Sequence, residues 1–176
     1  MATLYFKKIY PQARITAFGP DPTIAGYLRE NLRQGNADNV QVIEAAVWKN
    51  TGAMTFLPDG ADGGALVGSG EGIRVNTVDL RNWMNETVDL LKMDIEGAEM
   101  EVLEHCSTQL ANVQNIAVEY HERSGEHQYL EKLLSLLSTA GFQYHVFSKG
   151  GPVKPLANRY GPGNSPQMLD IFACRA

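Results

Sequence analysis

Short β-type segments alternate with helical segments along this chain of 176 residues. The first β-type segment covers residues 14–18. After it, Asp21 and Pro22 form a helix start, and apolar residues recur at helical spacing as far as Leu32. Strands that alternate with helices form βαβ units, in which crossover helices join parallel strands. The alternation therefore predicts an α/β protein with three layers, α/β/α, and a mostly parallel sheet.

The same patterns divide the rest of the chain into strands, helices and loops. We predict further strands at residues 40–47, 54–57, 73–75, 88–95, 114–120, 142–147 and 168–174. Helices are predicted at about residues 76–84, 99–110 and 126–140, and loops rich in glycine or proline at 59–72 and 149–166. The strand–loop–strand order at the end predicts a late antiparallel strand. Since the chain shows no internal repeat and no linker, residues 1–176 are expected to form one domain.

Composition narrows the classes of partner and the cellular location. Lys and Arg number 15 against 20 Asp and Glu, a net charge of −5, which is unlike the basic face of a nucleic-acid binder. No apolar run approaches the ~20 residues of a membrane span, and the N-terminus lacks a signal-peptide pattern. Cys106 and Cys174 have no metal-binding spacing, so we expect reduced, buried thiols. These patterns predict a cytoplasmic protein with neither a nucleic-acid nor a membrane partner.

Polar residues gather where predicted strands end, which is where doubly wound sheets bind their ligands. Asp94 and Glu96 lie at the end of the strand predicted at 88–95, and Glu99 follows within the same turn. Glutamates at this position either stabilise the N-terminus of the next helix or take part in chemistry. Asp94 is harder to explain as a structural residue, because a carboxylate that is buried without partners is costly.

A second polar group ends the strand predicted at 114–120 and contains Glu119, His121 and Glu122. A histidine beside carboxylates suits a general base near neutral pH, and the alternative is a hydrogen-bonded surface histidine. Metal ligation by His121, His127 and the acids has no recognised spacing, so no metal is expected.

Residues 68–72 read Gly-Ser-Gly-Glu-Gly, which is a partial match to a nucleotide-binding loop. Such a loop must follow a strand and open a helix. Here the next residues, 73–75, are β-type. A domain that binds a nucleotide or NAD through these glycines is therefore the weakest of the functional hypotheses.

The stretch LLKMDIEGAEMEVLE at residues 90–104 resembles the FkbM-type methyltransferase family. Members of this family are S-adenosylmethionine-dependent enzymes with a Rossmann-like fold. Weaker similarity to the family extends over almost the whole chain, in residues 15–32, 40–56, 75–80, 114–122, 140–147 and 169–175.

The resemblance implies a reaction and a site. The reaction is methyl transfer, most often to a hydroxyl oxygen, with a small molecule or a sugar as the acceptor. Asp94 and Glu96 would lie beside the methyl donor and the acceptor, and Glu119 and His121 would face the same cleft from the adjacent strand. Methyl transfer of this kind needs a base at the acceptor and in-line placement against the sulfonium methyl.

The resemblance also implies a cofactor site, with one departure from the family pattern. Ala45 and Ala46 would lie near the adenine, and Asp21 would follow the ribose-binding position. The family reads Phe-Glu-Pro-Asp-Pro at residues 18–22, whereas this chain has Gly19 in place of the glutamate. Charge-assisted hydrogen bonds are worth roughly 1.5–3 kcal/mol each, so we expect weakened or lost cofactor binding.

A second departure concerns the start of the domain. The family's first strand and its glycine-rich loop would lie before residue 1, because the 18 residues ahead of Gly19 contain no Gly-x-Gly. Either the natural gene product starts earlier, or the sheet closes differently, or a partner subunit covers the gap. For the chain without this strand we expect a homodimer, because an exposed strand edge favours association. The alternative to an enzyme is a non-catalytic, self-associating module that retains the methyltransferase fold.

Overall fold

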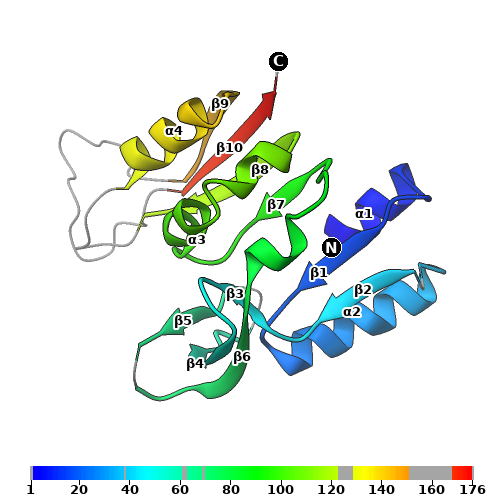
Figure 1. Cartoon of the computed structure of the whole chain (residues 1–176). Helices are drawn as coiled ribbons and strands as arrows, with labels where there is room; N and C mark the ends of the chain where they lie inside the picture. Colours follow the sequence, from blue (N-terminus) through cyan, green and yellow to red (C-terminus); the bar gives the residue numbers. More distant parts are fainter. Residues whose placement is uncertain are drawn as a thin grey trace. The chain divides into compact units, whose positions relative to one another are not determined.

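The computed structural model describes residues 2–37, 39–60, 63–68, 70–122, 129–150 and 168–175. The chain divides into two compact units, residues 1–79 and 80–176 (Figure 1). Within the described residues, no helix is both long enough and apolar enough to cross a membrane.

The first unit begins with a βαβ arrangement. Its elements are α1 (Ala2–Ile9), β1 (Ile15–Phe18), α2 (Pro22–Gln34) and β2 (Val40–Ile43). Strands β1 and β2 pair in parallel, with Ile15 opposite Val40. The predicted helix start is confirmed, because the Asp21 carboxylate accepts hydrogen bonds from the backbone N–H groups of Thr23 and Ile24 at 2.8 and 3.2 Å.

A four-stranded sheet in the order β3-β6-β4-β5 completes the first unit. Its strands are β3 (Ala46–Trp48), β4 (Gly52–Leu57), β5 (Ala65–Val67) and β6 (Ile73–Asp79). Strand β3 is parallel to β6, and β4 is antiparallel to β5 and β6. The predicted loop at 59–72 thus contains a short strand, which pairs with β4 along Thr55–Leu57.

Two other predictions for the first unit are wrong in detail. The strand predicted at 40–47 is two strands in two sheets, because a tight turn, in which the N–H of Ala45 donates to the carbonyl of Ile43 at 3.0 Å, separates them. The helix predicted at 76–84 is the end of β6 followed by a 3₁₀ turn, Leu80–Trp83. Burial of Val75 and Thr77 follows the two-residue period of a strand, and the Thr77 hydroxyl donates to the Asn50 carbonyl at 2.9 Å.

The second unit contains a four-stranded sheet in the order β7-β8-β10-β9. Its elements are β7 (Leu91–Met93), α3 (Glu99–His105), β8 (Asn115–His121), α4 (Leu130–Thr139), β9 (Phe142–Gly150) and β10 (Met168–Arg175). Strand β7 is parallel to β8, whereas β10 is antiparallel to both β8 and β9. The late antiparallel strand is therefore confirmed, while the strand at 88–95 and the helix at 99–110 are shorter than predicted. Helix α4 agrees with the described part of the helix predicted at 126–140, and residues 151–166 of the predicted loop lie outside the described residues.

The core of the second unit lies between its helices and its sheet. Fully buried side chains come from α3, α4 and the two central strands, and they include Val102, Leu103, Leu133, Leu137, Ile116 and Ile171. Cys106 is also buried and free, as predicted, but Cys174 is exposed. The prediction for Cys174 was wrong because β10 buries alternate residues, and Cys174 falls on the opposite face from Ala173.

Arg175, at the end of β10, forms hydrogen bonds with three other segments of the second unit. Its guanidinium donates to the carbonyl oxygens of Val113, Ala140 and Leu110 at 2.7, 2.9 and 2.7 Å. It also lies 4.5 Å from the centre of the Phe142 ring. These contacts hold β10 beside β8, the strand that carries two of the candidate catalytic residues.

Candidate active site

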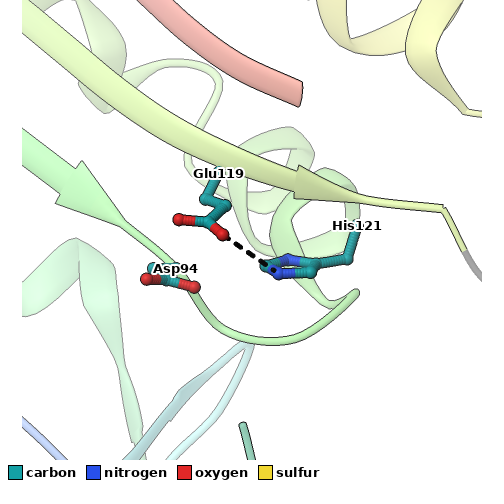
Figure 2. A group of neighbouring side chains, drawn as sticks. All are labelled: Asp94, Glu119 and His121. Atoms are coloured by element: carbon teal, nitrogen blue, oxygen red, sulfur yellow. Dashed lines mark ion pairs between the residues drawn. The ribbon is translucent and has the colours of Figure 1, made fainter. Parts of the chain in front are cut away.

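The parallel pair β7–β8 brings the two predicted groups of polar residues together. Met93 lies opposite Val118, so Asp94, the next residue after β7, lies beside the last residues of β8. Glu119 and His121 are two residues apart on β8 and therefore point to the same face of the sheet. Figure 2 shows the three side chains converging from these two strand ends.

A left-handed turn connects β7 to α3. Glu96 has a φ of 55° and Gly97 a φ of 92°. One carboxylate oxygen of Glu99, Oε1, accepts hydrogen bonds from the backbone N–H groups of Ile95 and Gly97, both at 3.1 Å. Glu99 thus stabilises the turn that precedes its own helix, while the N-cap residue, Ala98, makes no side-chain cap bond.

His121 lies at the centre of the site, among carboxylates. Its Nδ1 is 3.1 Å from Oε1 of Glu99, and its Nε2 is 3.6 Å from Oε2 of Glu96 and 3.7 Å from Oε1 of Glu119. The His121 side chain is 11% exposed and that of Glu99 only 1%. The alternative prediction was a hydrogen-bonded histidine at the surface. The histidine is hydrogen-bonded, but it is largely buried.

The surrounding carboxylates change the proton affinity of this histidine. Burial by itself lowers the pKa of His121, but the hydrogen bond that the ring donates to Glu99 and the negative charges of Glu99, Glu96 and Asp94 together raise it above its usual value. The pKa of Glu96 is also raised, first by burial and then by the charges of Asp94, Glu99 and Glu119, against the opposing effect of His121. The site thus favours a proton on His121.

Two lysines neutralise the outer side of the group. Lys149 Nζ lies 2.6 Å from Oε2 of Glu119, and Lys92 Nζ lies 3.1 Å from Oδ2 of Asp94. Sequence reasoning assigned a role to neither lysine, although Lys92 lies within the stretch at residues 90–104 that resembles the family. Lys149 lies on β9 and contacts Glu119 on β8 across the intervening strand β10. The sequence pattern does not specify this strand order.

The same group bears on metal binding. One ligand atom each from Asp94, Glu119 and His121 lie within 4.8 Å of one another. However, a lysine already pairs with each of these two carboxylates, and exposed acidic groups often gather without an ion. The expectation that no metal takes part stays a prediction. His127 lies outside the described residues.

The residues predicted to bind a cofactor lie in the first unit. The N–H of Gly19 donates to the carbonyl of Ile43 at 3.1 Å, and a Cβ at Gly19 would meet no atom within 4 Å. Asp21 caps α2, so its carboxylate is already engaged. Ala45 and Ala46 are 3% and 5% exposed, and Ala46 packs in a small apolar cluster with Phe56, Val75 and Leu66. Their roles in cofactor binding stay predictions.

The glycines at 68–72 connect two strands. Strand β5 ends at Val67 and β6 begins at Ile73, so a strand follows these glycines, as predicted, where a phosphate-binding loop would open a helix. At Gly72 an added Cβ would lie 2.5 Å from the carbonyl oxygen of Phe56. Gly72 therefore allows the backbone to pack closely against β4.

Comparison with solved structures identifies the fold. A methyltransferase FkbM from Methylobacillus flagellatus KT aligns with a TM-score of 0.58 and 14% identity, covering 97% of this chain and 40% of that one. A precorrin-6y C5,15-methyltransferase from Geobacter metallireducens GS-15 aligns with a TM-score of 0.52 and 17% identity, covering 99% and 73%. The fold is thus that of the Rossmann-like methyltransferases, and the polar site lies at the carboxyl ends of strands, where this fold binds its ligands.

Sequence comparison then gives the family. The model of the methyltransferase FkbM domain matches residues 2–144, and the chain belongs to this family. Among curated relatives, Methyltransferase 1 of Beauveria bassiana is 28% identical over 83% of this chain and 69% of its own length. The 2-O-methyltransferase NoeI of Sinorhizobium fredii is 28% identical over 67% and 58%, and Methyltransferase sdnD of Sordaria araneosa is 30% identical over 75% and 66%. The chain thus spans roughly three-fifths to two-thirds of the length of these relatives.

Proposed function

We propose that this protein transfers a methyl group from S-adenosylmethionine to a hydroxyl oxygen of a small molecule or sugar. The observation that carries the proposal is the buried His121, held among three glutamates where β7 and β8 end. The 2-O-methyltransferase named among the relatives supports an oxygen acceptor. The acidic balance of the chain, −5, supports a small-molecule acceptor over a nucleic acid.

His121 is the proposed general base. Its Nδ1 is engaged by Glu99, so Nε2 is the atom available to take the proton from the acceptor hydroxyl. With S-adenosylmethionine bound, the acceptor oxygen would then bond to the methyl carbon while the carbon–sulfur bond broke, and S-adenosylhomocysteine would leave. The imidazolium that forms on His121 is stabilised by the carboxylates of Glu96 and Glu119, which lie 3.6 and 3.7 Å from Nε2.

The charge of the site also suits the methyl donor. S-adenosylmethionine, when bound, supplies an electrophilic methyl carbon on a positively charged sulfonium. The four carboxylates of the site, Asp94, Glu96, Glu99 and Glu119, outnumber Lys92 and Lys149, and the remaining negative charge attracts a cation. The residues expected to bind the ribose, which belong to the first unit, fit less well, because residue 19 is glycine and the Asp21 carboxylate caps α2. We therefore propose that the protein binds this cofactor weakly.

A screen of hydroxyl-bearing acceptors tests the proposed function. Purified protein is incubated with S-adenosylmethionine and a panel of sugars and small alcohols, and release of S-adenosylhomocysteine is measured. We expect turnover by the wild type and a loss of at least about 100-fold in His121→Gln, since general-base catalysis contributes typically that much. His145→Gln is the matched control, because His145 is exposed on β9. Equal rates in the two variants would refute the role of His121.

A second candidate function is a non-catalytic, self-associating module located in the cytoplasm. Within the described residues, β1 and β7 each pair with a single strand, so each has an edge without a strand neighbour. This module would form a homodimer whether or not it binds S-adenosylmethionine. Light scattering at micromolar concentration together with calorimetry distinguishes the candidates, because a dimer with no cofactor binding at ~1 mM favours the module, and binding with turnover favours the enzyme.

A further inference from the structure

Glu99 is a buried carboxylate with several hydrogen-bond partners. Its side chain is only 1% exposed, and burial of an unpaired charge is costly. Oε1 lies 3.1 Å from each of three nitrogen atoms, which belong to the backbone of Ile95 and Gly97 and to the ring of His121. One oxygen atom on α3 therefore joins the turn after β7 to the end of β8.

This arrangement fixes which ring nitrogen of His121 carries the proton. The two backbone N–H groups only donate, so Oε1 of Glu99 is an acceptor, and Nδ1 of His121 must donate to it. In the neutral ring Nε2 then has the free lone pair. The distances from Nε2 to Glu96 and Glu119, 3.6 and 3.7 Å, are longer than a direct hydrogen bond. The lone pair thus faces the side of the ring where these carboxylates lie.

The same oxygen also holds Glu96 in place. A non-glycine residue with a φ of 55° is in a sparsely populated conformation that its surroundings must maintain. The N–H groups that Glu99 engages belong to the residues on either side of Glu96. Loss of Glu99 would therefore release the conformation of Glu96 together with the orientation of the His121 ring.

We propose that Glu99 is the positioning residue of the site, which fixes the Nδ1–H tautomer and the ring orientation of His121 while it holds Glu96 beside Nε2. This proposal rests on the proposed function for its consequence in catalysis. The charged groups around the ring are Asp94 and Glu96 from the turn, Glu99 from α3 and Glu119 from β8, with Lys149 from β9 on the far side of Glu119.

Nuclear magnetic resonance of ¹⁵N-labelled histidine tests the tautomer on the protein without ligands. The signals of His121 are identified by their loss in His121→Gln. In the wild type at a pH above the titration of the ring, we expect a protonated Nδ1 and an unprotonated Nε2. A neutral ring with its proton on Nε2 would overturn the proposal. This measurement needs no turnover, so it decides the role of Glu99 even if the proposed reaction is wrong.

Two variants then test the consequence. Glu99→Gln keeps an oxygen that can accept from the two backbone N–H groups but removes the charge beside Nδ1. We expect it to lower the titration midpoint of His121 and to lower kcat at least about tenfold, with KM changed less than about twofold. The matched control is Glu101→Gln, an exposed glutamate of the same helix, which should match the wild type.

The pattern of results separates the two proposals. If Glu99→Gln and Glu101→Gln give the same His121 titration, Glu99 is not the positioning residue, whatever the enzyme does. If the wild type shows no turnover but Glu99→Gln lowers the His121 midpoint, the positioning role stands and the proposed function fails. Should Glu99→Gln not fold, the tautomer of the wild type still decides the matter.

Discussion

The glycine at residue 19 offers a direct way to strengthen cofactor binding. The family pattern has a glutamate there, and the structure has space for one, since a Cβ at Gly19 would meet no atom within 4 Å. Gly19 also has no φ in the left-handed region. Its N–H donates to Ile43, and a glutamate keeps this bond. Gly19→Glu should therefore leave the fold intact, with stability unchanged or slightly raised because the unfolded chain has less freedom.

The expected gain follows from the hydrogen bonds that a carboxylate makes to ribose hydroxyls. Such charge-assisted bonds contribute about 1.5–3 kcal/mol each. One bond therefore lowers the Kd for S-adenosylmethionine by roughly 10- to 150-fold, since about 1.4 kcal/mol corresponds to a factor of ten. Isothermal titration calorimetry of the cofactor into wild type and Gly19→Glu measures this ratio.

Two controls separate the ribose contact from other effects of the substitution. Gly19→Gln adds a side chain of the same shape without a charge and should give a smaller gain. Gly26→Glu adds a carboxylate on α2, where a Cβ also meets no atom within 4 Å, and should leave the Kd unchanged. An unchanged Kd in folded Gly19→Glu would show that residue 19 does not contact the ribose. Absence of binding at ~1 mM in both wild type and Gly19→Glu would remove S-adenosylmethionine as the cofactor.

Four further predictions concern pH dependence, stability and assembly. The raised pKa of His121 means that kcat/KM should increase as the pH rises from below to above this pKa, and His121→Gln should abolish that limb of the profile. Because the pKa of His121 is higher in the folded than in the unfolded protein, protonation of His121 stabilises the folded state. This stabilisation is fully present at pH values below the unfolded pKa of about 6.5 and is lost as the pH rises through the folded pKa. In urea denaturation, the stability advantage of wild type over His121→Gln should therefore shrink as the pH rises through the folded pKa. Arg175→Ala should lower the free energy of unfolding by about 3 kcal/mol, because it removes three hydrogen bonds from a charged group, whereas Arg33→Ala, at an exposed i,i+3 pair, should change it by less than about 0.5 kcal/mol. Light scattering should give the mass of a homodimer, and a monomer at micromolar concentration would contradict the role assigned to the edges of β1 and β7.

Local signals in the sequence predicted several elements correctly. The Asp21–Pro22 start of α2 was predictable because capping depends on residues within one turn. Strands β8 and β10 were predictable from their β-type runs between loops or helices. The end of β6 was predicted as the start of a helix at about 76–84, whereas its pairing with Ala46–Trp48 and Gly52–Phe56, which are distant in the sequence, makes it a strand.

The candidate site was predictable in outline. Polar residues that follow parallel strands meet at one sheet edge, and this rule brought Asp94, Glu119 and His121 together. Two features were beyond local reasoning. The first is the contact of Glu99 with His121, which spans 22 positions and depends on how α3 packs against β8. The second is the pairing of Lys149 with Glu119, which spans 30 positions and depends on β10 lying between β8 and β9.

The initial rate of S-adenosylhomocysteine formation in the Gly19→Glu background tests methyl transfer by His121 most directly. This background is chosen because the cofactor is expected to bind it more tightly, so weak binding does not hide the chemistry. With an acceptor found in the screen, at a pH above the pKa of His121, Gly19→Glu should turn over, and Gly19→Glu/His121→Gln should be at least about 100-fold slower at saturating cofactor. Equal rates in the two proteins, or no turnover in either despite cofactor binding, would contradict a methyltransferase that uses His121 as its base.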